Sequence, residues 1–275
     1  MGLETGWGPE TPRNDTVLRA ALLAHADAFE HVVRSRGGWI LRDGGLALAD
    51  CGSPSFFLNS GFVLVPPGEG GYDPVLDGIE AFFGPRPGGG AIVFSPWPFP
   101  PLDRPGWELA GYPPVMVRPG GTSSVAAPPL PVPAELRIDE AADDELLSAF
   151  EAVLVDGFPM EELQPPRPGC VLDGRALDAS FHCWVGSVGR KPVAACAAYF
   201  TPDVVLVAWV ATLPGYRGRG YGAALTWAAL REAPRLAAAL IASDAGRPVY
   251  ERLGFLPVAR VTCLVMTERR PVRAR

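Results

Sequence analysis

The sequence lacks the features that mark three large classes of protein. No stretch approaches the roughly 20 uninterrupted apolar residues of a membrane-spanning helix, and the first residues hold no basic flank before an apolar core, so we expect a cytoplasmic protein that does not bind a membrane. Five cysteines and three histidines, with no C-x-x-C pair, predict neither a disulfide framework nor a metal site. Acidic residues outnumber basic ones by 30 to 24, which argues against a nucleic-acid partner.

What remains is the composition of an ordinary folded chain. Hydrophobic residues make up 48% and charged residues 20% of 275 residues, far from the profile of disorder. The length exceeds that of one average domain and favours two lobes. Most of the excess negative charge lies before Val132, so the second half can hold a local basic site for an anionic ligand.

The chain divides at a proline-rich segment. Residues 125–133 contain four prolines, which excludes a helix and disfavours a central strand. We therefore predict a first lobe over residues 1–124, an extended linker between the lobes over 125–133, and a second lobe over 134–275. Irregular stretches at 84–90 and 94–105 predict that the first lobe is rich in loops.

Hydrophobic periodicity predicts the order of elements in the second lobe. A strand and a helix open it, three strands of a meander follow, and two further helices alternate with two strands. These elements are expected at 135–138, 142–155, 181–188, 193–200, 204–212, 222–236, 239–243, 248–253 and 258–267. The pattern predicts an α/β (α+β) fold with a mixed, mostly antiparallel sheet flanked by helices.

Parts of the first half are similar in sequence to parts of the second. Residues 104–115 align with 247–258, with Trp107 opposite Tyr250. Residues 62–68 and the helical pattern that follows them at 74–83 also mirror 209–215 and its helix. This internal similarity predicts a tandem of two related lobes, of which the first has diverged.

A glycine-rich turn lies between a strand and a helix at residues 210–226. Such a turn exposes backbone N–H groups at the positive end of a helix, where a phosphate can bind. Its glycines allow close backbone approach, and its two arginines add positive charge: Arg217, Gly218, Arg219, Gly220 and Gly222. Taken alone, the glycines also fit a plain helix cap with solvated arginines.

The surrounding residues resemble a known family. Residues 217–222 resemble the acetyl-CoA-binding signature of the GNAT superfamily of N-acetyltransferases, Gln/Arg-x-x-Gly-x-Gly/Ala. Residues 240–243 and 246–255 resemble that superfamily's next strand and the helix that bears its tyrosine. The matched segments cover about residues 204–258, and the order of elements from Glu135 onward agrees with the family's fold.

The resemblance implies a cofactor, a partner and a site. Acetyl-CoA is the implied co-substrate and an amine the acceptor, in a monomer or homodimer. The implied cofactor-binding residues are Val210, Ala211 and Thr212 for the pantetheine arm, Arg217, Gly218, Arg219, Gly220, Tyr221, Gly222 and Ala223 for the pyrophosphate, and Ser243 on the next strand. Tyr250 is the implied catalytic residue, a general acid for the departing thiolate.

Several alternatives stay open at this point. Tyr250 also fits a core aromatic residue that packs against Phe255. The general base is not identified, and its candidates are Asp156, Glu161, Glu162 and His182. A longer acyl-CoA is a possible donor, and an acyl-CoA-binding sensor or scaffold without turnover is the non-enzymatic alternative.

The first lobe is expected to be inactive. Residues 68–73, at the position of the glycine turn, carry Glu69 and Asp73 where the second lobe has arginines. Trp107, opposite Tyr250, has no ionisable hydroxyl. We expect this lobe to support the fold and to form a wall of the acceptor pocket.

Overall fold

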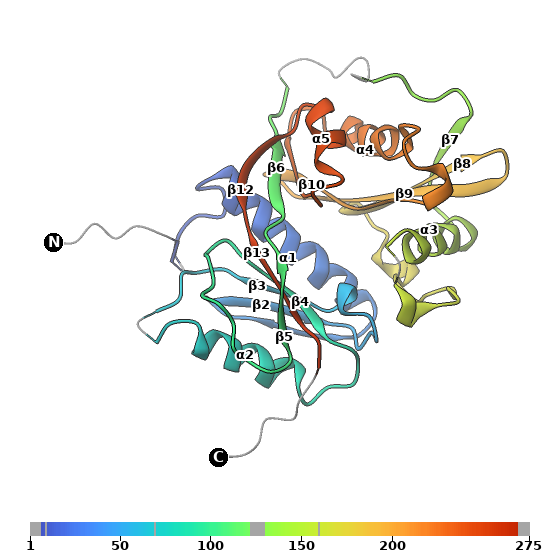
Figure 1. Ribbon diagram of the computed structural model, residues 1–275. Helices are drawn as coiled ribbons and strands as arrows, with labels where there is room; N and C mark the ends of the chain where they lie inside the picture. The colour runs from blue at the N-terminus through green and yellow to red at the C-terminus, as the bar shows by residue number, and fades with distance from the viewer. Residues whose placement is uncertain (1–6, 9, 69, 122–129, 159, 269–275) are drawn as a thin grey trace. The chain divides into compact units, whose positions relative to one another are not determined.

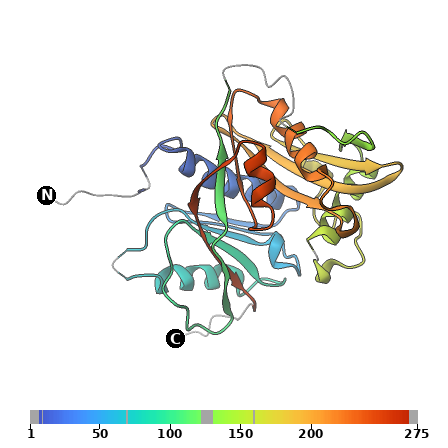
Figure 2. The same cartoon turned by 45° about the horizontal axis from the view of Figure 1, so that its top comes forward.

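The computed structural model describes residues 7–8, 10–68, 70–121, 130–158 and 160–268, which form two compact units. Unit 1 consists of Met1–Pro113 and Arg260–Arg275, and unit 2 of Pro114–Ala259. Among the described residues, unit 1 has a six-stranded sheet and unit 2 a seven-stranded one (Figures 1 and 2). Both sheets are mixed, mostly antiparallel and flanked by helices, which confirms the predicted fold class.

Unit 1 places a helix on each face of its sheet. Its strands follow the order β1-β2-β3-β4-β13-β5, in which β3 and β4 are parallel and the other neighbours antiparallel. On β3, Phe62 packs in the cluster that faces α1 and Val63 in the cluster that faces α2. The elements are α1 (Val17–Ser35), β1 (Trp39–Arg42), β2 (Leu46–Asp50), β3 (Ser60–Val63), α2 (Asp73–Phe83), β4 (Ala91–Ser95), β5 (Trp107–Gly111) and β13 (Thr262–Met266).

Residues 84–90 and 96–105 carry neither helix nor strand, as expected for the first half, but its long helix α1 was not predicted. The Thr16 side chain accepts a hydrogen bond from the Arg19 N–H and caps this helix. Arg19, His25 and Glu30 are buried together with the helix's apolar residues, so polar residues interrupt the apolar stripe that periodicity analysis needs.

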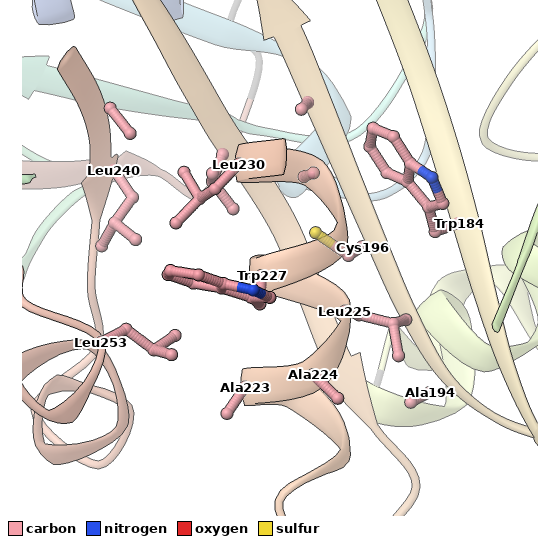
Figure 3. Close-up of a cluster of buried hydrophobic side chains, with 14 of the residues drawn as sticks. Trp184, Ala194, Cys196, Ala223, Ala224, Leu225, Trp227, Leu230, Leu240 and Leu253 are labelled. Atoms are coloured by element: carbon pink, nitrogen blue, oxygen red, sulfur yellow. The ribbon is translucent and has the colours of Figure 1, made fainter. Parts of the chain in front are cut away.

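Unit 2 has the order β12-β6-β11-β10-β9-β8-β7, in which β10 and β11 are parallel. Helices α3 and α4 cover opposite faces of the sheet (Figure 1). In the core beneath α4, the Trp227 ring lies by Leu240 and Leu253 (Figure 3). The elements are β6 (Pro114–Arg118), β7 (Leu136–Glu140), α3 (Asp144–Gly157), β8 (Phe181–Val188), β9 (Lys191–Phe200), β10 (Val204–Thr212), α4 (Tyr221–Glu232), β11 (Ala237–Ile241), α5 (Arg247–Arg252) and β12 (Leu256–Arg260).

The two units exchange strands. Strand β6 follows β5 of unit 1 in the sequence but pairs with β11 of unit 2. Strand β13 follows β12 of unit 2 but lies between β4 and β5 of unit 1. The single final strand predicted at 258–267 was therefore wrong, because two strands in different sheets meet at Val261. The division into units also differs from the predicted lobes of 1–124 and 134–275.

The proline-rich segment connects strands of one unit. Residues 122–129, which hold most of it, lie outside the described residues, and residues 130–133 carry neither helix nor strand. The strands on either side of it, β6 and β7, both belong to the sheet of unit 2. The predicted linker between lobes thus leads from one strand of unit 2 to another.

The two sheets share one plan of strand order. In each, a helix connects a parallel pair, β3-α2-β4 or β10-α4-β11, and the exchanged strand and an edge strand follow. The alignment of Trp107 with Tyr250 is wrong, however, because Trp107 begins strand β5 whereas Tyr250 lies in helix α5. The Trp107 Nε1–H donates to Glu80 of α2 at 2.7 Å, so the ring belongs to the core of unit 1.

In the part of the chain that the structure describes, the helices are too short or too polar to cross a membrane.

The strand exchange predicts how truncation affects each unit. A chain ending at Ala259 keeps unit 2 but lacks β13, so we expect the backbone amides of β4 to lose protection from hydrogen exchange while those of β9 and β10 keep it. Hydrogen exchange with mass spectrometry measures both. A chain ending at Thr267 keeps β13 and is the control. Unchanged protection of β4 in the shorter chain would contradict the exchange.

Candidate functional site

Strand β10 is irregular near its end. Its register with β9 shifts between Ala208 and Ala211, and Trp209 adopts a φ of 50° in the left-handed region. A bulky residue reaches that region at a cost of about 1–3 kcal/mol, so the surrounding packing must hold it there. The Trp209 ring packs edge-on against Phe181 at 5.9 Å.

Strands β10 and β11 part just before this irregularity. Their parallel pairing runs from Val204 to Leu206 on β10 and ends there among the described residues. The predicted pantetheine-binding residues Val210, Ala211 and Thr212 lie beyond that point, and Ala211 and Thr212 pair only with β9 on the other side. Parted strands leave a backbone edge to which an amide-rich chain can add as a further strand would.

The glycine turn follows directly and ends in an open helix terminus. After the short 3₁₀ turn η4 (Pro214–Tyr216), Gly218 and Gly220 adopt φ values of 76° and 84°. Gly220 is the N-cap of α4, and no side chain accepts from the first N–H groups of the helix. The N–H groups of Tyr221, Gly222 and Ala223 are thus the first of α4, where the helix dipole favours an anion.

Arg217 makes two contacts that the sequence did not suggest, and its implied contact with the pyrophosphate stays a prediction. Its Nε–H donates to the Thr212 carbonyl oxygen and its Nη2 to that of Gly157, both at 3.0 Å. The guanidinium therefore ties the end of β10 to the C-terminus of α3, whose partial negative charge suits a cation. This arrangement makes Arg217 a positioning residue for the glycine turn.

The side chain of Tyr221 is buried and fixes the start of α4. Its hydroxyl donates to Glu135 Oε1 at 2.8 Å, and this hydrogen bond raises the pKa of Tyr221. Glu135 directly precedes β7, so the contact joins the start of α4 to the edge of the sheet that β7 forms. Ala223 is also buried, and Tyr221 and Ala223 can therefore serve a cofactor only through their backbone.

Ser243 and Tyr250 lie at the α5 side of the site. The Ser243 hydroxyl accepts the Gly246 N–H at 3.0 Å and shapes the turn before α5. The Tyr250 ring packs edge-on against Phe255 at 5.9 Å, and burial first, then the nearby Cys196, raises the pKa of its phenol. The hydroxyl stays protonated at neutral pH, as a general acid must.

The four candidate bases are separated in the structure. Asp156, on the last turn of α3, accepts from Gln164 Nε2 at 2.8 Å, and Glu161 and Glu162 lie in the 3₁₀ turn η2 (Glu161–Leu163). His182 Nδ1 contacts Glu140 Oε1 at 2.6 Å, beside a cavity of about 340 Å³ at the N-terminus of α3. Asp156 neighbours Gly157, which contacts β10 at Ala211, and His182 neighbours Phe181, which packs against Trp209.

Two residues that support the site could not be identified from the sequence. A Cβ on Gly157 would lie 2.9 Å from the Ala211 Cβ, so only glycine lets α3 approach the irregular part of β10. Glu151, buried on α3, accepts three backbone N–H groups of residues 169–172 at 2.7–2.8 Å and holds the loop that follows the helix. Glycine near a helix end and a carboxylate in a helix are each too common to be informative alone.

Within the described ranges, no cluster of histidine, cysteine, aspartate or glutamate side chains could hold a metal ion.

The close contact of α3 with β10 yields a prediction. Gly157→Ala should destabilise the protein by about 1–3 kcal/mol through overpacking, although alanine favours helices, and should weaken cofactor binding because the contact partner, Ala211, is displaced. Urea unfolding and calorimetric titration with coenzyme A measure the two effects. Gly174→Ala is the matched control, because its Cβ would meet side-chain atoms only at 3.9 Å. Equal stability of both variants would contradict the packing argument.

Comparisons with known proteins agree with this geometry. The GCN5-related N-acetyltransferase from Kribbella flavida is 22% identical, with 90% of this chain and 96% of that chain covered at a TM-score of 0.61. A conserved protein of unknown function from Staphylococcus epidermidis is 11% identical, with 94% and 99% covered at a TM-score of 0.57. At these identities the likeness shows a shared fold, and it extends over nearly the whole chain.

A search of curated protein sequences found no match. The family model of the acetyltransferase (GNAT) family matches residues 144–255, from the start of α3 through Phe255. The matched range contains the irregular end of β10, the open N-terminus of α4 and Tyr250. Residues 144–255 of this chain are therefore similar to the acetyltransferase (GNAT) family.

Proposed function

We propose that the protein is an N-acetyltransferase that moves the acetyl group of acetyl-CoA to a primary amine of a small molecule, peptide or protein. The observation that carries the proposal is the open N-terminus of α4 beside the point where β10 leaves β11. One place in unit 2 thus offers both an anion site and a free backbone edge. A pyrophosphate linked to an amide-rich arm matches the two together.

The described residues support a division of roles. The N–H groups of Tyr221, Gly222 and Ala223 would hold the pyrophosphate, and the backbone of Val210 and Ala211 would bind the pantetheine arm. The Thr212 carbonyl already accepts from Arg217, so the contribution of Thr212 to the cofactor is limited to its other groups. Gly222 lies against this strand end, since its Cβ would be 3.4 Å from Val210 and 3.6 Å from the Thr212 hydroxyl.

The chemistry requires an acid and a base. The amine must lose a proton before attack because a free alkyl amine has a pKa of about 10. Asp156 is our base candidate, because its neighbour Gly157 contacts Ala211 in the irregular part of β10; His182, whose neighbour Phe181 packs against Trp209, is the alternative. The amine nitrogen then bonds to the acyl carbon, the carbon–sulfur bond breaks, and the Tyr250 hydroxyl protonates the departing thiolate. The proton that the nitrogen loses as the amide forms restores the Tyr250 hydroxyl, directly or through water.

We further propose that unit 1 is a diverged copy that does not bind the cofactor. Its α2 occupies the place of α4 in the shared sheet plan, but the first turn holds Asp73 and Pro74. Proline has no N–H to donate, and the carboxylate repels a phosphate. Glu69, the other acid expected there, lies outside the described residues.

A sensor or scaffold that binds acyl-CoA without turnover is the alternative. The presence of a tyrosine in α5, where the GNAT resemblance implies the general acid, favours the enzyme.

The first test of the proposal concerns binding. Calorimetric titration should give one coenzyme A per chain, and Gly220→Glu should abolish binding, because the new side chain must adopt a φ of 84° and brings a negative charge to the start of α4. Gly68→Glu, in the corresponding loop of unit 1, should leave affinity unchanged. Two sites per chain, or full affinity of the Gly220 variant, would refute the assignment.

The second test concerns chemistry. Tyr250→Phe keeps the ring that packs on Phe255 and removes only the hydroxyl. If this hydroxyl protonates the thiolate, kcat should fall by about 100-fold or more while the affinity for coenzyme A changes little. Thiol release and calorimetry measure the two quantities. Full activity of the variant would return Tyr250 to a packing role and leave water as the proton donor.

A further inference from the structure

Two cationic side chains converge on one aromatic ring of the glycine turn. The Lys191 ammonium lies 5.2 Å from the centre of the Tyr216 ring, and the Arg219 guanidinium lies 5.4 Å from it. Cations at this distance are attracted by the ring's quadrupole. The ring thereby gathers two positive charges that come from separate parts of the chain.

Strand register explains why Lys191 is there. The turn Gly189–Arg190 between β8 and β9 uses a φ of 60° at Gly189, so that Lys191 pairs with Val188. A few residues along β9, Ala194 pairs with Thr212, the last residue before the glycine turn. The hairpin end is therefore held beside Tyr216 by the sheet itself.

The charges around the ring leave a net positive site. Arg217 already donates to the carbonyl oxygens of Thr212 and Gly157, as described above. Arg219 donates to Gly215 O at 3.4 Å and lies near the Glu135 carboxylate, which partly offsets its charge. Lys191 forms no ion pair with any described residue.

We propose that Lys191 and Arg219 form a second phosphate site, which binds the ribose 3′-phosphate of coenzyme A. The inference rests on the proposed function, because the ligand must first place its pyrophosphate at α4. Arg219 belongs to the glycine turn itself and Lys191 reaches it from the hairpin, so both charges lie beside the pyrophosphate site. A phosphate monoester there would interact with a guanidinium fork and a mobile ammonium, the two groups that proteins use to bind phosphate.

Comparing coenzyme A with 3′-dephospho-coenzyme A tests this directly. Calorimetric titration of the wild-type chain should show about tenfold tighter binding of coenzyme A, a difference of about 1.4 kcal/mol. In the Lys191→Gln, Arg219→Gln double variant the ratio of the two Kd values should fall to near one, because the charges that contact the 3′-phosphate are lost; a contribution of Arg219 to pyrophosphate binding would weaken both ligands equally and leave the ratio unaffected. The affinity for the dephospho ligand should change much less than that for coenzyme A.

Arg190→Gln is the matched control, since Arg190 precedes Lys191 in the same turn and has no contact with the Tyr216 ring among those the structure describes. It should keep the wild-type ratio, and urea unfolding should show that all variants are folded. A wild-type ratio of one, or an equal loss for both ligands in the double variant, would overturn the second phosphate site and leave the proposed function intact. Failure of the wild-type chain to bind either ligand would overturn both.

Discussion

The end of β10 is the constraint on which the rest of unit 2 depends. Trp209 leaves extended geometry, the pairing with β11 stops after Leu206, and the strand runs on with a free edge towards the glycine turn. Such an arrangement is unfavourable without support, because it combines a strained backbone with unpaired peptide groups. The neighbouring elements supply that support. Gly157 lets α3 pack on Ala211, and Arg217 donates a hydrogen bond to the Thr212 carbonyl oxygen.

The strand exchange makes the two units depend on each other in folding. Ile92 of β4 pairs with Val265 of β13, and the whole of unit 2 lies between them in the sequence. Unit 1 therefore cannot complete its sheet until almost the entire described chain has been synthesised. Pairing over such a separation closes a long loop and is slow relative to local contacts. Strand β6, which directly follows unit 1 in the sequence, is also an interior strand of the sheet that bears the candidate site.

The elements around the candidate site that depend on local chemistry were predictable from the sequence. The glycine turn, the helix after it and the meander before it follow from periodicity and from backbone freedom at Gly218 and Gly220. The strand exchange could not be predicted, because an apolar run such as residues 258–267 does not indicate which sheet the strand joins. The contacts of Arg217 could not be predicted for another reason. A guanidinium beside a glycine turn suggests a phosphate ligand. Only the packing of α3 shows that the Arg217 guanidinium already donates hydrogen bonds to two carbonyl groups.

The central claim is that the open edge of β10 and the open N-terminus of α4 serve acyl transfer rather than binding without turnover. The most direct measurement is the release of free thiol from acetyl-CoA by the wild-type protein against a panel of amines, polyamines, aminoglycosides and peptides, with mass spectrometry of the products. The account predicts that at least one primary amine raises thiol release well above hydrolysis in its absence and appears as its N-acetyl derivative. Tight binding of acetyl-CoA with no acetylated product from any amine in the panel would contradict it and support a binding protein instead.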